Sequence, residues 1–113
     1  MPQRSAPPRP AVADALLLLG QLVREARLGR RWTRDELAVR AGVSTPTVAA
    51  IEAGAPGTAV ATVFSVAELV GVPIFGIDDP LELARRRRSG EEKLALLPSR
   101  VRHRTSDDLD DDF

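Results

Sequence analysis

Hydrophobic residues recur three and four positions apart along residues 11–76, and glycines interrupt the pattern at short intervals. This spacing is typical of helices that bury one face, because successive residues of a strand would alternate between two faces instead. The pattern predicts four short helices up to residue 76 and a fifth helix beyond it. The expected fold class is therefore all-α, with five helices.

The first helix is expected from about Val12 to Leu28. One of its faces carries apolar residues at helical spacing, namely Ala15, Leu18, Leu19, Leu22 and Ala26. Three further apolar residues widen that face, namely Leu16, Leu17 and Val23. Two interpretations follow: the whole surface belongs to a broad core helix, or part of it contacts a second chain.

The second helix has a complete start signal. Thr33 is a good N-cap, and Glu36 three residues later completes a capping box. Trp32, just before the cap, can pack on Leu37 and is therefore expected in the core rather than stacked on a nucleic-acid base. The helix is expected to end at Gly42, because a residue without Cβ adopts the left-handed conformation most easily.

The third helix is expected to begin after Ser44 as N-cap, with Pro46 in its first turn, and to end near Ala53. Two helices joined by so short a turn form a helix-turn-helix, with Val48 and Ile51 holding the second helix on the first. Such a motif presents one side of a short helix to a DNA major groove about 12 Å wide.

A fourth helix, capped by Thr58, is expected to end before Gly71, and residues 72–75 are expected to close the core. Asp79 is expected to cap a fifth helix, with Pro80 at its first position. The arginines at 85–88 would then lie in its last turns, where cations favour the helix macrodipole.

The chain thus divides into four expected parts. A proline-rich leader without hydrophobic pattern is expected to be disordered, and the last residues are expected to form a flexible tail. The boundaries are a leader at 1–10, a helix-turn-helix domain at 11–78, an extra helix at 79–90 and a charged tail at 91–113.

The 113-residue chain has 16 Lys plus Arg, 16 Asp plus Glu, one His and no Cys, so its formal net charge is zero. The absence of Cys excludes a disulfide scaffold and a thiolate nucleophile. The one His, His103, lies between two arginines, which disfavours metal binding and general-base catalysis. We therefore expect no enzyme activity, no metal and no cofactor.

The apolar run at residues 15–19 is too short to cross a bilayer or to act as an export signal. We therefore expect a cytoplasmic protein with no membrane partner.

Zero net charge conceals an uneven distribution. Six arginines lie between residues 24 and 40, against three acidic residues: the arginines are Arg24, Arg27, Arg30, Arg31, Arg34 and Arg40. They gather around the end of the first helix and the start of the second, where phosphates would lie if the third helix entered a groove. A solvated charged face would have the same sequence pattern, so both interpretations stand.

Residues 34–44 (RDELAVRAGVS) and 47–54 (TVAAIEAG) resemble the helix-turn-helix of the xenobiotic-response-element, or phage lambda repressor/Cro-like, regulators. Residues 67–75 resemble the end of the fourth helix in that family. The resemblance implies a lambda repressor-like fold over about residues 12–78. It also implies that Arg34 touches phosphate or base and that the third helix carries outward-facing DNA contacts.

The expected DNA-binding residues are Arg30, Arg31, Arg34, Ser44, Thr45, Pro46, Thr47, Ala49 and Ala50. Two positions depart from the family pattern, which usually has Gln in place of Arg34 and longer polar side chains in place of Ala49 and Ala50. Bidentate base recognition needs Arg, Lys, Asn or Gln, and none occurs between Ser44 and Gly54. Direct base discrimination is therefore expected to be weak. Glu52 is expected to pair with a nearby arginine rather than to read DNA.

The C-terminal tail mixes leucines with basic residues and ends in a cluster of aspartates. Small lambda repressor-like proteins with such an extension are similar to HipB-type antitoxins, which repress their own operon and bind a HipA-type Ser/Thr kinase toxin. That similarity implies partner contacts at Leu109, Asp110, Asp111, Asp112 and Phe113. An acidic tail that only increases solubility would have the same composition.

The sequence therefore predicts a transcriptional repressor that binds double-stranded operator DNA and also acts as the antitoxin of a HipA-type kinase. A homodimer is expected, because one short helix covers too few base pairs. The expected location is the bacterial cytoplasm, with nucleoid association when the protein is bound to DNA. The alternative is a helix-turn-helix protein-interaction module with little specific DNA binding.

Overall fold

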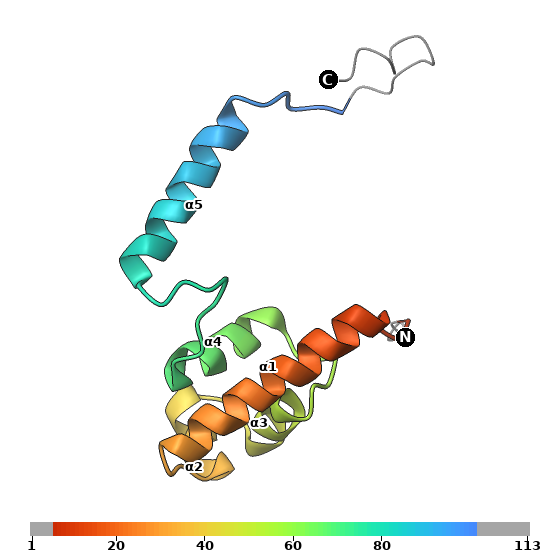
Figure 1. The fold of residues 1–113 in the computed structure, drawn as a ribbon, viewed down its shortest axis with the longest axis vertical. Coiled ribbons are helices and arrows are strands. Elements are labelled where there is room, and N and C mark those ends of the chain that lie inside the picture. Colours follow the sequence, from red (N-terminus) through yellow and green to blue (C-terminus); the bar gives the residue numbers. More distant parts are fainter. Residues whose placement is uncertain (1–5, 102–113) are drawn as a thin grey trace. The chain divides into compact units, whose positions relative to one another are not determined.

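In a computed structural model, which describes residues 6–101, the chain forms five α-helices and no β-strand within that range (Figure 1). The helices are α1 (Pro10–Gly29), α2 (Arg34–Ala41), α3 (Thr45–Glu52), α4 (Val60–Val70) and α5 (Pro80–Ala95). The predicted all-α fold with five helices is confirmed. The chain divides into two compact units, one with α1–α4 that ends at Asp78 and one with α5 that begins at Asp79.

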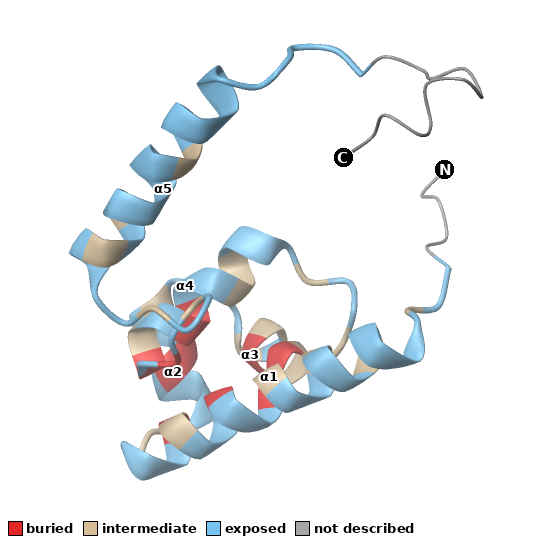
Figure 2. Cartoon of the chain, turned by 45° about the horizontal axis from the view of Figure 1, so that its top comes forward, coloured by how far each residue is buried: buried red, intermediate tan, exposed pale blue. Residues whose placement is uncertain are grey.

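One hydrophobic core holds the first unit together. Helices α1 and α2 each pack against both α3 and α4. The buried apolar residues come from all four helices and from the segment after α4: they are Val23, Leu37, Ala38, Val48, Ile51, Val66, Ala67, Val70 and Val72. Figure 2 shows these buried positions on the facing sides of α1–α4.

The contact between α1 and α3 is close because Gly20 has no side chain. A Cβ at Gly20 would lie 2.5 Å from the carbonyl oxygen of Ile51 and 2.6 Å from that of Glu52. The face of α1 that turns inward therefore carries Gly20, Val23 and Arg27. The predicted inner face was wrong in part, since Leu18 and Leu22 are exposed. The periodicity favoured the largest apolar side chains, whereas this contact requires the smallest residue.

The predicted start and end of α2 are confirmed. The Thr33 hydroxyl accepts a hydrogen bond from the Glu36 amide at 3.0 Å, and the Glu36 carboxylate accepts one from the Thr33 amide at 3.2 Å. Gly42 ends the helix in the left-handed conformation, with φ of 69°. Trp32 is partly buried against the hydrophobic core, as expected.

The start of α4 differs from the prediction. Its N-cap is Ala59, and no side chain caps it, so the assignment of Thr58 as cap was wrong. Because α4 begins one residue later than expected, Thr58 stands outside the cap position.

The segment 72–75 also closes the core less completely than expected: Val72 is buried, but Phe75 is 79% exposed, with a φ of 56°. Its ring contacts Phe64 edge to face, at 6.0 Å between ring centroids.

Helix α5 begins as predicted, with the Asp79 carboxylate accepting a hydrogen bond from the Leu81 amide at 3.0 Å and Pro80 at the first position. It continues to Ala95, past the expected end at residue 90. The arginines at 85–88 therefore lie in the middle of the helix, and their predicted place in its last turns was wrong. Ion pairs one turn apart support this longer helix: Glu82–Arg85, Glu82–Arg86 and Arg87–Glu91.

None of the described helices has the length and apolar character that a membrane span requires.

A buried ion pair connects α1 to α3. Arg27 Nε donates to Glu52 Oε2 at 2.6 Å, and Arg27 Nη2 donates to Glu52 Oε1 at 3.0 Å. Arg27 Nη1 also donates to the carbonyl oxygen of Trp32 at 2.9 Å, and Arg34 Nε donates to Glu52 Oε1 at 3.2 Å. The side chains of Arg27 and Glu52 are 8% and 2% exposed. Glu52 therefore has the structural role that the sequence predicts.

Burial by itself disfavours the charged form of Glu52. The hydrogen bonds and positive charges of Arg27 and Arg34 outweigh that effect and hold the pKa of Glu52 below its ordinary value. The same hydrogen bond raises the pKa of Arg27 against the desolvation that opposes it. The pair is therefore charged in the folded protein at neutral pH.

The substitution Glu52→Gln is expected to lower the free energy of unfolding by about 3–5 kcal/mol at pH 7, because it leaves the Arg27 charge buried without its partner. The pH profile should change as well. The carboxylate contributes stability above its unfolded-state pKa of about 4.3, and this contribution disappears as the pH falls through the lower folded-state value. The variant should lose less stability than the native chain over that acidic range.

Urea unfolding followed by circular dichroism between pH 7 and pH 3 measures both effects. Glu68→Gln, at an exposed position of α4, is the matched control and should leave stability unchanged within about 0.5 kcal/mol. Equal losses in the two variants at pH 7 would contradict the role of the ion pair.

Candidate DNA interface

The first turn of α3 is fixed by three side-chain hydrogen bonds. Ser44 caps the helix by accepting from the Thr47 amide at 3.2 Å, and its hydroxyl oxygen lies 2.7 Å from that of Thr47. Thr45 Oγ1 donates to Asp35 Oδ1 of α2 at 2.8 Å. Hydrogen bonds within the chain therefore fix the position of the start of α3 relative to α2.

A shallow cleft runs between the first turns of α3 and α4. Its volume is about 520 Å³, and its lining residues are Val43, Ser44, Pro46, Thr47, Ala50, Gly57, Thr58, Ala59 and Thr62. The structure thus brings together four of the predicted DNA-binding residues, namely Ser44, Pro46, Thr47 and Ala50. Thr45 and Ala49, also predicted, are partly buried and do not line the cleft.

The sequence interpretation missed the half of this cleft that α4 and the preceding loop supply, including Thr58 and Thr62. A signal was present in the turn-forming residues at 56–58, which indicate a loop between two helices. Nothing in the pattern places that loop beside α3, because this contact arises from the packing of α4 on the core.

The chemistry of the cleft is neutral. Its lining offers hydroxyl groups and methyl-sized apolar surface, and no charged side chain lines it. Hydroxyls can donate to or accept from base edges, and small apolar groups fit a thymine methyl. Thr45 and Thr47 already use their hydroxyls inside the protein. The arrangement suits shape and methyl recognition better than bidentate pairing with a purine.

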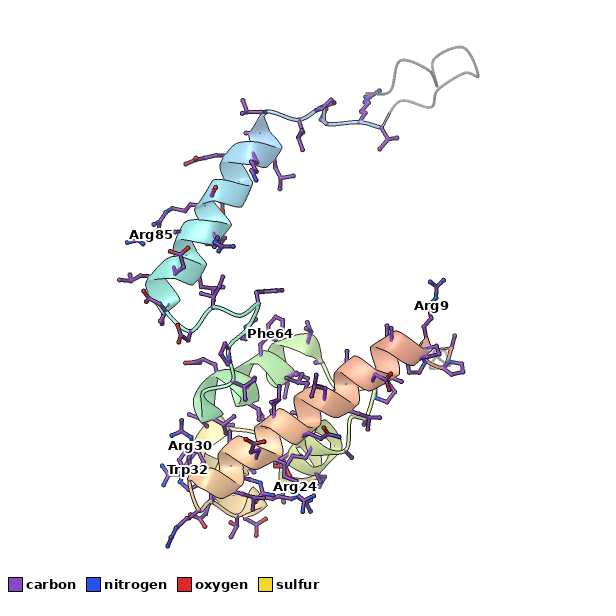
Figure 3. The ribbon with its side chains drawn as sticks, viewed as in Figure 1. Arg9, Arg24, Arg30, Trp32, Phe64 and Arg85 are labelled. Atoms are coloured by element: carbon purple, nitrogen blue, oxygen red, sulfur yellow. The ribbon has the colours of Figure 1, made fainter. Side chains whose placement is uncertain are left out.

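The predicted arginine cluster separates into two groups in the structure. Arg30 donates from Nε and Nη2 to the carbonyl oxygen of Val70, at 3.2 and 3.1 Å, and so holds the end of α4. Arg30 and Arg40 also lie over the Trp32 ring, at 5.4 and 4.4 Å from its centroid. Figure 3 shows Arg30 beside Trp32. These two arginines and the buried Arg27 therefore have partners within the fold.

The second group consists of Arg24, Arg31 and Arg34. Arg34 is 48% exposed and uses one nitrogen for Glu52. Arg24 and Arg31 are exposed, and neither guanidinium group makes a hydrogen bond or an ion pair within residues 6–101. Arg31 has a φ of 59°, a conformation that costs a side-chain-bearing residue about 1–2 kcal/mol. Among the six arginines between residues 24 and 40, the guanidinium groups of these three make no hydrogen bond to a backbone carbonyl and no cation–π contact within residues 6–101.

The predicted partner residues at 109–113 lie outside the described residues. Within the described part, no three side chains of the kinds that bind metals come together.

Comparison with known proteins gives a match to one family model. The model describes a helix-turn-helix domain and matches residues 18–74, from the middle of α1 through α4. A search of curated proteins and a search of solved structures each found no significant match. The matched stretch amounts to half of the chain and includes α2, the turn at Gly42 and α3. The chain therefore belongs to the helix-turn-helix domain family, which marks it as a DNA-binding regulator.

Proposed function

We propose that this protein is a transcriptional repressor that binds operator DNA as a homodimer, with the start of α3 in the major groove. The observation that carries the proposal is the geometry at that start. Ser44 and Pro46 are exposed on the first turn of α3, while the half-exposed Arg34 opens the neighbouring helix α2. The fold thus holds an exposed helix start beside a half-exposed cation, and this arrangement supports the proposal.

Affinity and specificity come from different parts of this surface. Arg24, Arg31 and Arg34 are available for phosphates, which supply attraction and orientation but carry no direct sequence information. Sequence is read by the small neutral side chains of the cleft and by the deformability of the DNA. Two copies then read two half-sites about 34 Å apart, so the dimer is more specific for its operator than one copy would be.

A second candidate is a protein-interaction module that keeps the fold without specific DNA binding. The observation in its favour is that α3 has no side chain able to make a bidentate base contact, and that two of its hydroxyls are bonded within the protein. The following experiment distinguishes the two candidates.

The protein is expected to retard the DNA upstream of its own gene and to keep doing so when nonspecific competitor is added. Pro46→Glu should reduce this binding at least tenfold, because it places a negative charge beside the phosphates. The fold should remain intact, since Glu is favourable in the first turn of a helix. Val39→Glu adds the same charge at an exposed position of α2 outside the cleft and should bind nearly as the native chain does.

Mobility-shift titrations at two salt concentrations provide the measurement, and thermal unfolding checks each variant. Retardation that competitor abolishes completely would favour the interaction module. Equal losses in Pro46→Glu and Val39→Glu would show that DNA does not meet the cleft.

Arg31→Gly is expected to separate stability from DNA binding. Glycine suits the left-handed backbone at this position, so the free energy of unfolding should stay within about 1 kcal/mol of the native value. Loss of one phosphate contact should reduce the slope of log affinity against log salt by about 0.9. Arg31→Lys keeps the charge and should keep the slope. An unchanged slope in Arg31→Gly would remove Arg31 from the interface.

We further propose that the repressor is the antitoxin of a HipA-type kinase and regulates the operon that encodes both. The proposal is supported by the resemblance of the acidic tail, which has Leu109 and Phe113 among aspartates, to the tails of HipB-type antitoxins. DNA binding then belongs to the helix-turn-helix unit, and kinase binding belongs to the tail.

Truncation after Arg104 is expected to leave DNA binding intact and to abolish co-purification with a kinase encoded beside this gene. Pull-down from cells that express both proteins, followed by a mobility-shift assay on the same samples, measures the two properties. Phe113→Ala in the full chain should weaken capture of the kinase, whereas Gln3→Ala near the other end should not. Kinase retention by the truncated chain, or the absence of a neighbouring kinase gene, would contradict the antitoxin role.

A further inference from the structure

Helix α5 has no buried residue although it is 16 residues long. A helix of this length is marginal in water without packing on another element, even when its ends are capped. Its ion pairs and the Asp79 cap account for part of its stability. Its leucines remain exposed, and Figure 2 shows α5 in pale blue and tan, with no buried position. Within the described part of its own unit, residues 79–101, the leucine-bearing face of α5 therefore has no packing partner.

One face of α5 has the spacing of a helix that pairs with another helix. Leu83, Arg87, Gly90 and Leu94 follow one another at intervals of four, three and four residues, which keeps them on one side. Leu97 continues the interval just beyond the helix end. We call these residues the α5 seam. Two other exposed leucines, Leu81 and Leu96, fall on the opposite side by the same spacing.

Gly90 has no explanation within its own chain. Glycine in the middle of a helix is less favourable than alanine. Gly90 does not adopt a positive φ, and a Cβ built on it would meet nothing within 4 Å. Neither backbone conformation nor internal packing therefore requires glycine here. A second helix that crosses closely at this point would require it.

The α5 seam complements itself when a second copy runs in the opposite direction. Leu83 then faces Leu94 of the second copy, and Arg87 faces Gly90 of the second copy, so the longest side chain of the seam meets the residue that leaves room for it. The basic stretch at 85–88 also faces Glu91 and Glu92 of the other helix. A parallel pair in register would instead oppose Arg87 to Arg87, which is unfavourable.

We propose that α5 pairs antiparallel with α5 of a second copy through this seam. The charge of Arg87 is already compensated in this contact, because Arg87 forms an ion pair with Glu91 one turn away on the same helix. The inference rests on the homodimer of the proposed function and names its contact surface. Its test needs no DNA, so its failure is distinguishable from a failure of operator binding.

The absence of Cys from the chain allows a direct test of orientation. Leu83→Cys and Leu94→Cys are prepared as separate full-length proteins, oxidised alone and as an equimolar mixture, and run on non-reducing gels. An antiparallel pair brings residue 83 of one copy near residue 94 of the other. The mixture should therefore form a disulfide-linked heterodimer at least tenfold more efficiently than either protein alone.

Leu81→Cys and Leu96→Cys are the matched controls, because they occupy corresponding levels on the opposite side of α5. Their mixture should not crosslink. Leu83→Cys that crosslinks alone as well as in the mixture would overturn the antiparallel arrangement, and no crosslink above the controls would overturn pairing through the seam.

Sedimentation of the full chain gives a second, independent readout. Leu94→Glu should weaken dimerisation at least tenfold, whereas Leu81→Glu should change it less than twofold. Leu94 and Leu81 are 67% and 68% exposed, so neither change removes buried contacts of the single copy. Circular dichroism of both variants checks that a carboxylate near either end of the helix leaves α5 folded. A dimer that survives Leu94→Glu unchanged would place the contact elsewhere, for example on the exposed leucines of α1, and would contradict the proposal.

Discussion

The arrangement of the helix-turn-helix depends on the buried pair between Arg27 and Glu52. Two charges in a protein interior are stable only when each compensates the other, and here both charged side chains are engaged by hydrogen bonds. Because Glu52 is the last residue of α3 and Arg27 lies near the end of α1, the pair fixes how α3 lies against α1. The close approach at Gly20 occurs at the same end of α3. Charge compensation at one end of α3 thus positions the exposed start of the helix at its other end.

The parts of this fold that the sequence predicts are those that depend on neighbours within four residues. The capping box at Thr33, the turn at Gly42 and the cap at Ser44 are of this kind. The inner face of α1 depends on a contact with α3, which lies about 30 residues further along the sequence. Periodicity does not reveal that contact, and it wrongly predicted that Leu18 and Leu22 face the core. The end of α5 was also predicted wrongly, since the helix continues past residue 90 to Ala95.

At the candidate interface, too, local features could be predicted from the sequence and contacts between distant residues could not. The exposed start of α3 follows from local signals, but the partners of the arginines do not, because the carbonyl group that Arg30 contacts belongs to Val70 on another helix. A count of arginines also does not separate their roles, since Arg27 is neutralised by Glu52, whereas Arg30 and Arg40 are held by a carbonyl oxygen and an aromatic ring. The cleft beside the start of α3 is lined by no charged side chain. Under the proposed function, such a surface would leave selectivity to the shape of the duplex and to the joint action of two copies.

Trp32, the chain's single tryptophan, contacts the guanidinium groups of Arg30 and Arg40 at the junction of α1 and α2. All indole fluorescence of this protein consequently originates at one place, next to the left-handed Arg31 and to the contact that holds the end of α4. A change in emission would therefore report on a change at that junction. The molecule thus carries a built-in optical probe of the segment where two of its helices and its strained arginine meet.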